Sequence, residues 1–279
     1  MNSAPRDRAN LSRQRAGDIL LRKSVWALDD EEVAALRAAF AGAQAIGDSR
    51  GYGHFASLHG FPEPGYCEHR NQLFLPWHRG YLYFFEQALQ DVVPGVALPW
   101  WDWTVSRDLP PLFADRTDAD GHPNPLFDAP ITAMGGQREP DWPERTTRPD
   151  DRPPTWLPGG GLPTQEDVDE VYAATDFDDL TFRLENVHNA VHVWVGGEMG
   201  DQRFAGWDPL FWAHHTMVDR VWALWQLQHP GDVPRRQHLR KGLNYFRDMT
   251  VADTLNYTDL GYDYAVAEIL VHDAGGDGG

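Results

Sequence analysis

The chain has 279 residues, a formal net charge of −18 at pH 7, 42% hydrophobic residues and 12 tryptophans. So much apolar and aromatic surface excludes an intrinsically disordered chain. The charge argues against nucleic-acid and membrane-surface partners, and it disfavours an anionic substrate unless local positive charge at a metal site overrides the net field.

Hydrophobic periodicity predicts helices at 30–46, 78–93, 179–195 and 210–228. Between the second and third, residues 105–163 are rich in Pro, Gly, Asp and Arg, which predicts a long surface excursion without a metal role. We therefore expect a single domain over residues 1–279, mainly α, in which a four-helix bundle surrounds a buried centre, with long irregular loops and little strand.

No segment near the N-terminus has the apolar core of a signal peptide, and no run of about 18 apolar residues occurs elsewhere. This pattern predicts a cytoplasmic chain, or one exported only with a partner that carries its own signal. The single cysteine, Cys67, excludes an internal disulfide and leaves the redox compartment open.

Two histidines in the third predicted helix, His188 and His192, are four residues apart and project from one face, where they can bind one ion. Zinc proteases place Glu directly after the first histidine, whereas Asn189 stands here. His214 or His215 can supply a third imidazole, and only one of them can join the same ion because adjacent residues differ by about 100° around a helix.

A second histidine group lies upstream and consists of His54, His59, His69 and His78. Three neutral imidazoles per ion suit copper or zinc, and the lack of a bridging carboxylate cluster disfavours a di-iron or di-manganese site. For four other histidines we expect no metal role: His122, His229, His238 and His272.

Two segments carry a family resemblance. Residues 69–86, HRNQLFLPWHRGYLYFFE, resemble the copper A signature of tyrosinases, and residues 208–219, DPLFWAHHTMVD, resemble the copper B signature shared by tyrosinases, catechol oxidases and hemocyanins. Further similarities extend from Arg22 to Tyr264 and include HNAVHVW at 188–194.

The resemblance implies two copper ions per chain, with dioxygen or peroxide bridging them. By motif position, His59, His69 and His78 would hold copper A, and His188, His192 and His215 would hold copper B, with His214 as the neighbour that is not a ligand. Cys67, two residues before His69, resembles the cysteine that forms a thioether to this histidine in fungal members.

In relatives that hydroxylate monophenols, a glutamate before the first copper B histidine and an asparagine after it hold a water that helps to deprotonate the phenol. Here Asn189 occupies the second position. Glu185 is the candidate for the first, although it stands only three residues before His188, closer than in many relatives.

The resemblance also implies that Arg22 pairs with Tyr262 and Tyr264. Asp219, one helical turn after His215, is expected either to support that ligand or to form a salt bridge with an arginine. The glycine-rich loop 196–207 should line the entrance to the metal centre.

The function implied is a tyrosinase-like phenol oxidase that converts monophenols and o-diphenols to o-quinones with dioxygen. The alternatives are a catechol or o-aminophenol oxidase without hydroxylase activity, a hemocyanin-like oxygen carrier, and a structural zinc bundle. The expected partners are a small phenol and dioxygen. Whether a copper-delivery or export protein is also a partner stays open. No C-terminal lid domain is expected.

Overall fold

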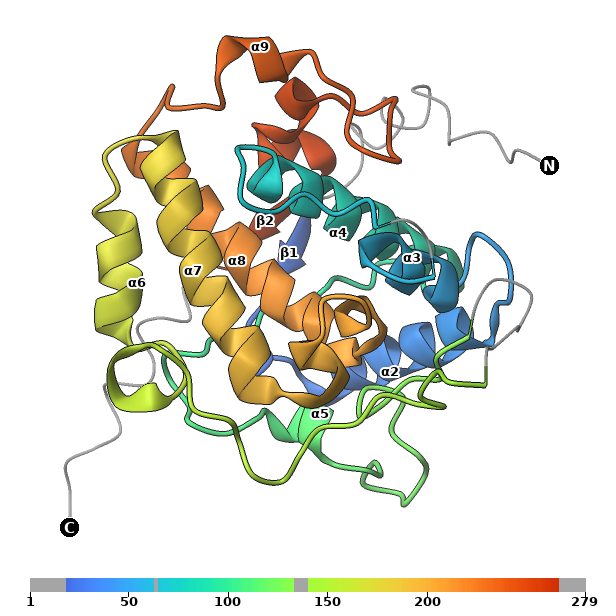
Figure 1. The fold of residues 1–279 in the computed structure, drawn as a ribbon. Coiled ribbons are helices and arrows are strands. Elements are labelled where there is room, and N and C mark those ends of the chain that lie inside the picture. Colours follow the sequence, from blue (N-terminus) through green and yellow to red (C-terminus); the bar gives the residue numbers. More distant parts are fainter. Residues whose placement is uncertain (1–18, 63–64, 133–139, 266–279) are drawn as a thin grey trace.

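The computed structural model describes residues 19–62, 65–132 and 140–265 and is mainly helical (Figure 1). The longer helices are α2 (Asp30–Ala45), α4 (Phe74–Val92), α7 (Phe177–Val195) and α8 (Pro209–Gln228), and the shorter ones are α3 (Tyr52–His59), α5 (Pro111–Ala114), α6 (Gln165–Tyr172) and α9 (Arg236–Leu239). Two short strands, β1 (Leu20–Arg22) and β2 (Tyr262–Tyr264), pair in parallel. The expectation of a mainly α chain with little strand is confirmed.

Single 3-10 turns complete the described elements: η3 (Pro158–Gly160), η4 (Gly197–Gly200), η5 (Ala205–Trp207), η6 (Val251–Thr254) and η7 (Tyr257–Leu260). Within the described ranges, no helix combines the length and apolar character needed to cross a bilayer.

Local capping explains where two of the long helices begin. The Asp29 side chain accepts the backbone N–H of Glu32, and the Glu32 side chain accepts that of Asp29, so the first turn of α2 is closed by a reciprocal pair. At α8, Asp208 accepts the N–H of Leu210 at 2.8 Å, and Pro209 fills a position where no N–H is needed.

Helix α4 begins at Phe74, one turn earlier than the sequence pattern predicts. Pro76 does not prevent this, because the N–H groups of a first turn have no partner within the helix. His78 therefore lies inside the helix rather than at its start, and its Nδ1 donates to the carbonyl of Phe74 one turn earlier, at 2.8 Å.

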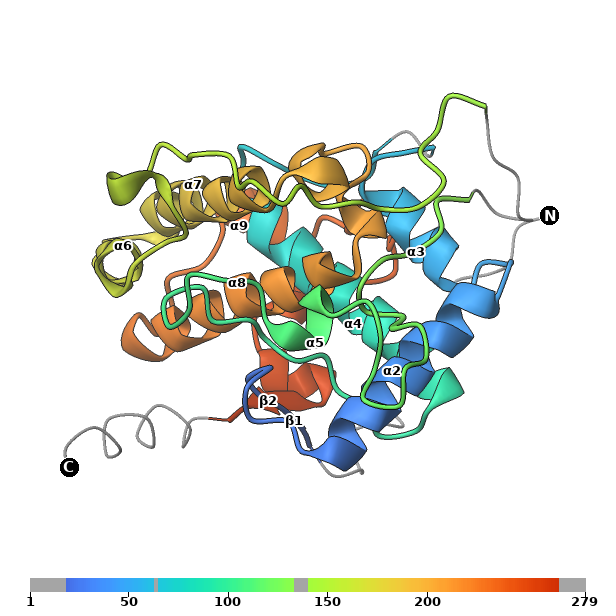
Figure 2. The same cartoon turned by 90° about the horizontal axis from the view of Figure 1, so that it is seen from below.

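Helices α4, α7 and α8 pack against one another around the centre of the molecule, and Figure 2 shows α7 and α8 side by side with α4 between them and α3. The fourth helix at the centre is α3, which the periodicity did not predict because it has only 8 residues. Phe55 of α3 meets Phe85 of α4, with ring centroids 5.6 Å apart. The predicted helix at 30–46 instead forms α2, which packs outside α3 and α4.

Tryptophan side chains fill much of the space between these helices. The following are less than 2% exposed: Trp77, Trp101, Trp103, Trp207, Trp212, Trp222 and Trp225. Such large rings exclude water from the centre and hold neighbouring side chains in single orientations.

Part of the segment 105–163 is buried, which corrects the expectation of a surface excursion. Phe113, Leu126 and Ile131 are at most 1% exposed. Arg148 pairs with Asp208 at 2.5 Å, and these side chains are 5% and 0% exposed. The segment anchors the start of α8 through isolated side chains, which a search for periodicity cannot detect.

The predicted pairing of Arg22 with the C-terminal tyrosines is confirmed. Arg22 donates to Glu86 of α4 at 2.9 and 3.1 Å, and its guanidinium carbon lies 3.5 Å from the ring centroid of Tyr262. The hydroxyls of Tyr262 and Tyr264 donate to Asp219 of α8 at 2.6 and 2.5 Å. These bonds join both strands to α4 and α8.

Asp219 forms salt bridges with arginines, which decides between its two expected roles. Its carboxylate lies 2.5 Å from Nε of Arg79 and 3.4 Å from Nη1 of Arg22, all buried. Burial alone would raise the pKa of Asp219, but the charges of Arg79 and Arg22 lower it below its ordinary value.

Candidate dinuclear metal centre

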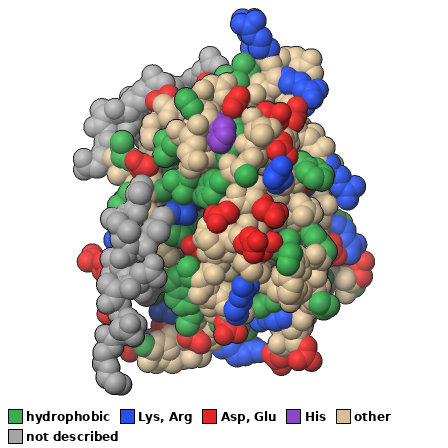
Figure 3. Space-filling view, turned by 90° about the vertical axis from the view of Figure 1, so that its left-hand side faces the viewer, with side chains coloured by type: hydrophobic (Ala, Val, Ile, Leu, Met, Phe, Trp, Pro, Cys, Tyr) green, Lys and Arg blue, Asp and Glu red, His purple; other side chains and the backbone are tan. Residues whose placement is uncertain are grey.

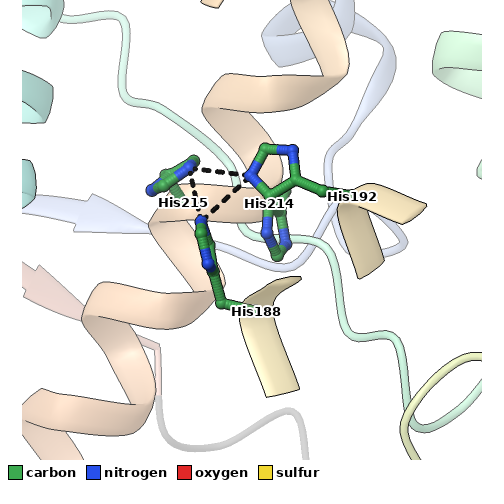
Figure 4. A group of neighbouring side chains, drawn as sticks. All are labelled: His188, His192, His214 and His215. Atoms are coloured by element: carbon green, nitrogen blue, oxygen red, sulfur yellow. Dashed lines mark hydrogen bonds between the residues drawn. The ribbon is translucent and has the colours of Figure 1, made fainter. Parts of the chain in front are cut away.

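Three imidazoles from α7 and α8 converge on one point. His188 and His192 lie one turn apart on α7, and His215 reaches them from α8 (Figure 4). Their Nε2 atoms form a triangle with sides of 2.9, 3.2 and 3.3 Å. A cation bound by imidazoles about 2.0 Å away holds the nitrogens roughly 3.3 Å apart, so the triangle has the size of a metal site.

In two of these rings, His188 and His192, the other ring nitrogen shows that Nε2 carries a lone pair. Nδ1 of His192 donates to the carbonyl of Met199 at 2.8 Å, and Nδ1 of His188 donates to Oδ1 of Asn189 at 3.1 Å. A neutral imidazole has one N–H, so Nε2 of both rings can only accept. Lone pairs that face one another at these distances repel unless a cation lies between them, and the site fits a metal ion.

His214 belongs to the same group of four neighbouring histidines but takes a different partner. Its Nδ1 accepts the indole N–H of Trp103 at 2.9 Å, and its ring stacks on that of His188 with centroids 5.1 Å apart. In Figure 4 its ring lies outside the triangle of the other three. His214 is therefore placed to support His188.

The second group consists of His59, His69 and His78, whose candidate ligand atoms lie within 4.8 Å of one another. Nδ1 of His59 donates to the carbonyl of Gln202 at 3.1 Å, and Nδ1 of His78 donates to the carbonyl of Phe74 at 2.8 Å. Nε2 of both rings is buried without a hydrogen-bond partner. Such buried acceptors are costly unless a ligand satisfies them, so this group also fits a metal ion.

The two groups face each other across a short distance. The rings of His78 and His215 are stacked with centroids 4.6 Å apart, and those of His69 and His188 are 5.9 Å apart. His54, the fourth upstream candidate, is elsewhere: its Nε2 lies 2.8 Å from the hydroxyl of Tyr245. The six histidines of the two groups, three from each, therefore surround one common space.

Burial is the main cause of a lowered pKa at all six imidazoles. The pKa falls from 6.5 to about 4 for His69 and His192. It falls well below 6.5 for His59, His78, His188 and His215, where neighbouring imidazoles add to the effect of burial. All six are neutral at pH 7, which is the protonation state that binds metal.

Comparison with known proteins agrees with this geometry. The family model for the common central domain of tyrosinase matches residues 49–228. A tyrosinase from Streptomyces antibioticus is 37% identical over 224 residues, which cover 68% of this chain and 78% of that protein. The chain belongs to the tyrosinase family.

Solved structures share the fold. A functional unit of octopus hemocyanin superposes with a TM-score of 0.73 and 31% identity, over 88% of this chain and 68% of that one. A tyrosinase from Burkholderia thailandensis superposes with a TM-score of 0.74 and 24% identity, over 88% of this chain and 73% of that one. Tyrosinase-family proteins bind two copper ions, and the two histidine groups fit such a centre.

A cavity of about 660 Å³ lies beside this tyrosinase-family centre. Its wall includes Arg70, Phe182, Glu185, Asn189, Arg235 and His238. Two of these residues directly follow histidines of the centre, one from each group. The cavity therefore lies next to both histidine groups, although none of the six histidines is part of its wall.

Glu185 and Asn189, the predicted catalytic pair, are one turn apart on α7 and both line this cavity. The Glu185 side chain is 6% exposed. Both of its carboxylate oxygens accept the backbone N–H of Arg70, at 2.8 and 2.9 Å. Burial raises the pKa of Glu185 above its ordinary value.

The loop 196–207 contacts both histidine groups, but none of its residues lines the cavity beside the centre, so its place at the entrance stays a prediction. Met199 and Gln202 accept from His192 and His59, as given above. The Gln202 side-chain amide also lies 3.1 Å from Nδ1 of His69 and 3.5 Å from Sγ of Cys67. Sequence reasoning assigned no role to Gln202, and its only signal was its place in this loop.

Of the four histidines expected to lack a metal role, the three that the structure describes belong to neither group. His122 is exposed and forms a cluster with Asp118 and Asp120, but Asp118 is already bonded to two backbone N–H groups of the same turn. His229 stacks on Trp225, with ring centroids 4.2 Å apart. His238 lines the cavity, and His272 lies outside the described residues.

Proposed function

We propose that this chain is a dicopper enzyme that converts monophenols and o-diphenols to o-quinones with dioxygen. The observation that carries the proposal is the cavity beside the centre, because its wall presents a carboxylate, Glu185, next to both histidine groups. We assign His59, His69 and His78 to one copper ion and His188, His192 and His215 to the other.

Bound copper would supply the electron-transfer chemistry of dioxygen. In the overall reactions, one monophenol and one dioxygen give one o-quinone and one water, whereas two o-diphenols and one dioxygen give two o-quinones and two waters. The protein must position the ring, remove the phenolic proton and keep bulk water out.

Glu185 is the group that we assign to the proton. Its raised pKa makes it a stronger base than an exposed glutamate. The N–H of Arg70 occupies only part of the accepting capacity of its two oxygens, so each retains a lone pair for a substrate hydroxyl or a water. Asn189 has Oδ1 fixed by His188, which leaves its amide N–H groups free to donate to the same water.

The second candidate function is reversible oxygen carriage, which the 31% identity to an octopus hemocyanin unit favours. A carrier and an enzyme can share the metal centre and differ in whether a phenol reaches it. A cavity next to both histidine groups, large enough for a phenol ring, supports the enzyme.

The test uses copper-loaded protein with 4-tert-butylcatechol and 4-tert-butylphenol, following dioxygen uptake and quinone absorbance. We expect both to be consumed, with one dioxygen per phenol and one per two catechols. Turnover of the catechol alone would indicate a catechol or o-aminophenol oxidase. Reversible dioxygen binding without turnover of either compound would indicate a carrier and reject the proposal.

A further inference from the structure

The wall of the cavity beside the centre carries an arginine, Arg70, whose guanidinium has no direct ion pair in the described part of the chain, although its charge acts on the nearby Glu185 carboxylate. Arg70 is exposed, and among the described residues its guanidinium forms no hydrogen bond, ion pair or contact with a ring. The second arginine of the wall, Arg235, pairs with Asp178 at 2.8 Å. Arg70 is therefore the cation of this wall that is open to a ligand.

The backbone fixes the position of Arg70. Its φ is +57°, in the left-handed region that a residue other than glycine seldom adopts. This conformation directs its N–H to both oxygens of Glu185, and the residue directly follows His69. Its N–H is held by Glu185 and its backbone is attached to His69, so the Cβ of Arg70 stays close to the metal centre.

The free guanidinium contrasts with the rest of the molecule. The chain has a formal net charge of −18, and red carboxylates gather at the middle of the face that Figure 3 shows, which is the side of α6 in Figure 1. An anion is repelled by such a surface, except where a local cation reverses the field. The cavity is such a place, because Arg70 stands beside the site for two copper ions whose six ligands are neutral.

The proposed reaction increases this positive field. When Glu185 takes the phenolic proton, its charge is neutralised, and the arginines of the wall then exceed the ionised carboxylates facing them. An aromatic side chain, Phe182, lines the same cavity and is 75% exposed, so it is available to contact an incoming ring.

We propose that the preferred substrates are phenols or catechols with a carboxylate on a short side chain, and that Arg70 is the specificity residue that binds the carboxylate. The inference rests on the proposed function for its chemistry. A planar guanidinium pairs with a carboxylate through two parallel N–H bonds, which orients the ring as well as attracting it.

The test compares 3-(3,4-dihydroxyphenyl)propionate with its methyl ester, which has the same catechol ring and no charge. The readout is the ratio of kcat/KM for the acid to kcat/KM for the ester. In Arg70→Gly this ratio should fall roughly fivefold, the size of one partly exposed ion pair. Glycine adopts positive φ without strain, so the N–H that holds Glu185 is retained.

Two variants control the experiment. Arg70→Lys keeps the charge but loses the planar fork, so its ratio should lie between those of wild type and Arg70→Gly. Arg50→Gln removes an equal charge at an exposed arginine that pairs with Asp48 and does not line the cavity, so its ratio should equal that of wild type. Equal ratios in wild type and Arg70→Gly, with the ester still turned over, would overturn the inference alone.

A binding measurement separates this inference from the proposed function. The copper-loaded chain is titrated calorimetrically with 3-phenylpropionate and with its amide, neither of which has a phenolic hydroxyl to oxidise. The acid should bind about fivefold more tightly than the amide, and the difference should disappear in Arg70→Gly. This result without catechol turnover would reject the proposed oxidase and keep the anion site, whereas equal binding of acid and amide would reject the site.

Discussion

The two histidine groups are built in different ways. The group of His188, His192 and His215 comes from two packed helices, and two of its members share one face of α7. In the group of His59, His69 and His78, one member ends α3, one lies in the loop before α4, and one lies within α4. Copper B would rest on rigid helices, whereas copper A would depend on a loop being held in place.

One loop nevertheless acts on both groups. Met199 accepts the Nδ1 proton of His192, and Gln202, three residues later, accepts that of His59. These bonds set which nitrogen of each ring faces the metal. The difference between the groups therefore lies in the segments that carry the histidines, and their orientation is coordinated by residues 196–207.

The largest expected effect on copper content and activity comes from substituting the adjacent histidines of α8. His215→Gln should remove one copper ion per chain and lower catechol oxidation at least about 1,000-fold. His214→Gln should keep two copper ions and lower catechol oxidation by about 10- to 100-fold, because His214 only supports a ligand. Copper analysis and oxidase assays check both. The opposite pattern, with copper lost only from His214→Gln, would show that the ligand of the B group was assigned wrongly.

The next effect concerns Glu185, which stands on α7 but is bonded to the loop of the other group. Glu185→Gln removes the proposed base, so hydroxylation of a monophenol should fall about 100-fold while catechol oxidation changes by only a few-fold. Initial rates with the tert-butyl phenol and catechol measure this. Glu170→Gln, at an exposed carboxylate of α6, serves as control. Equal losses on both substrates would show that Glu185 has only a structural role.

The contrast between the groups also explains what the sequence could reveal. The spacing of His188 and His192 predicts a shared helix face directly, because helix geometry is local. The helices around α4, α7 and α8 follow from apolar periodicity for the same reason. His59 and His69 were assigned only through family resemblance, since no periodicity specifies the end of a short helix or the path of a loop.

Features that depend on tertiary contacts were not predictable. The left-handed backbone of Arg70 and its bonds to Glu185 join residues 115 positions apart. The burial of Phe113 and Ile131 in an irregular segment likewise arises from packing that no local pattern records. The pairing of Arg22 with two tyrosines was expected from the resemblance, but the inclusion of Arg79 and Glu86 in the same buried network was not.

A smaller effect is expected on resistance to a copper chelator, which reports the difference in rigidity between the groups. His78→Gln leaves only the B group complete, and His188→Gln leaves only the A group complete. The copper that remains in His78→Gln should withstand about tenfold more chelator than the copper that remains in His188→Gln. Two of its ligands share a helix and therefore need less ordering on binding. Equilibrium titration with a copper chelator provides the comparison. Equal resistance would mean that the loop of His69 is as well fixed as α7.

Acid should destabilise the metal-free fold through both groups. His69 and His192, one from each group, have a pKa of about 4 in the fold against 6.5 ordinarily. Between these values the unfolded chain binds more protons, so the free energy of unfolding should fall as pH is lowered from 6.5 towards 4. The slope for each buried histidine is about 1.4 kcal/mol per pH unit. Denaturant unfolding at pH 7, 6 and 5 measures it, and a flat profile would contradict the lowered pKa values.

The smallest expected effect concerns Cys67. Burial raises the pKa of this free thiol, and its Sγ and Nδ1 of His69 contact the same Gln202 amide. We predict a thioether between Cys67 and His69, formed with the loss of two hydrogen atoms when the copper-loaded chain meets dioxygen as oxidant.

Peptide mass spectrometry should find the segment that contains both residues lighter by two hydrogens after aerobic copper loading, and unchanged after anaerobic loading. The bond would tie the only ligand in a loop to the backbone at a second point. Cys67→Ser should therefore lower the chelator resistance of the A group about threefold and leave that of the B group unchanged, since one loop constraint is lost. Unchanged peptide mass with wild-type resistance in Cys67→Ser would mean that the loop is held by Gln202 and Arg70 alone.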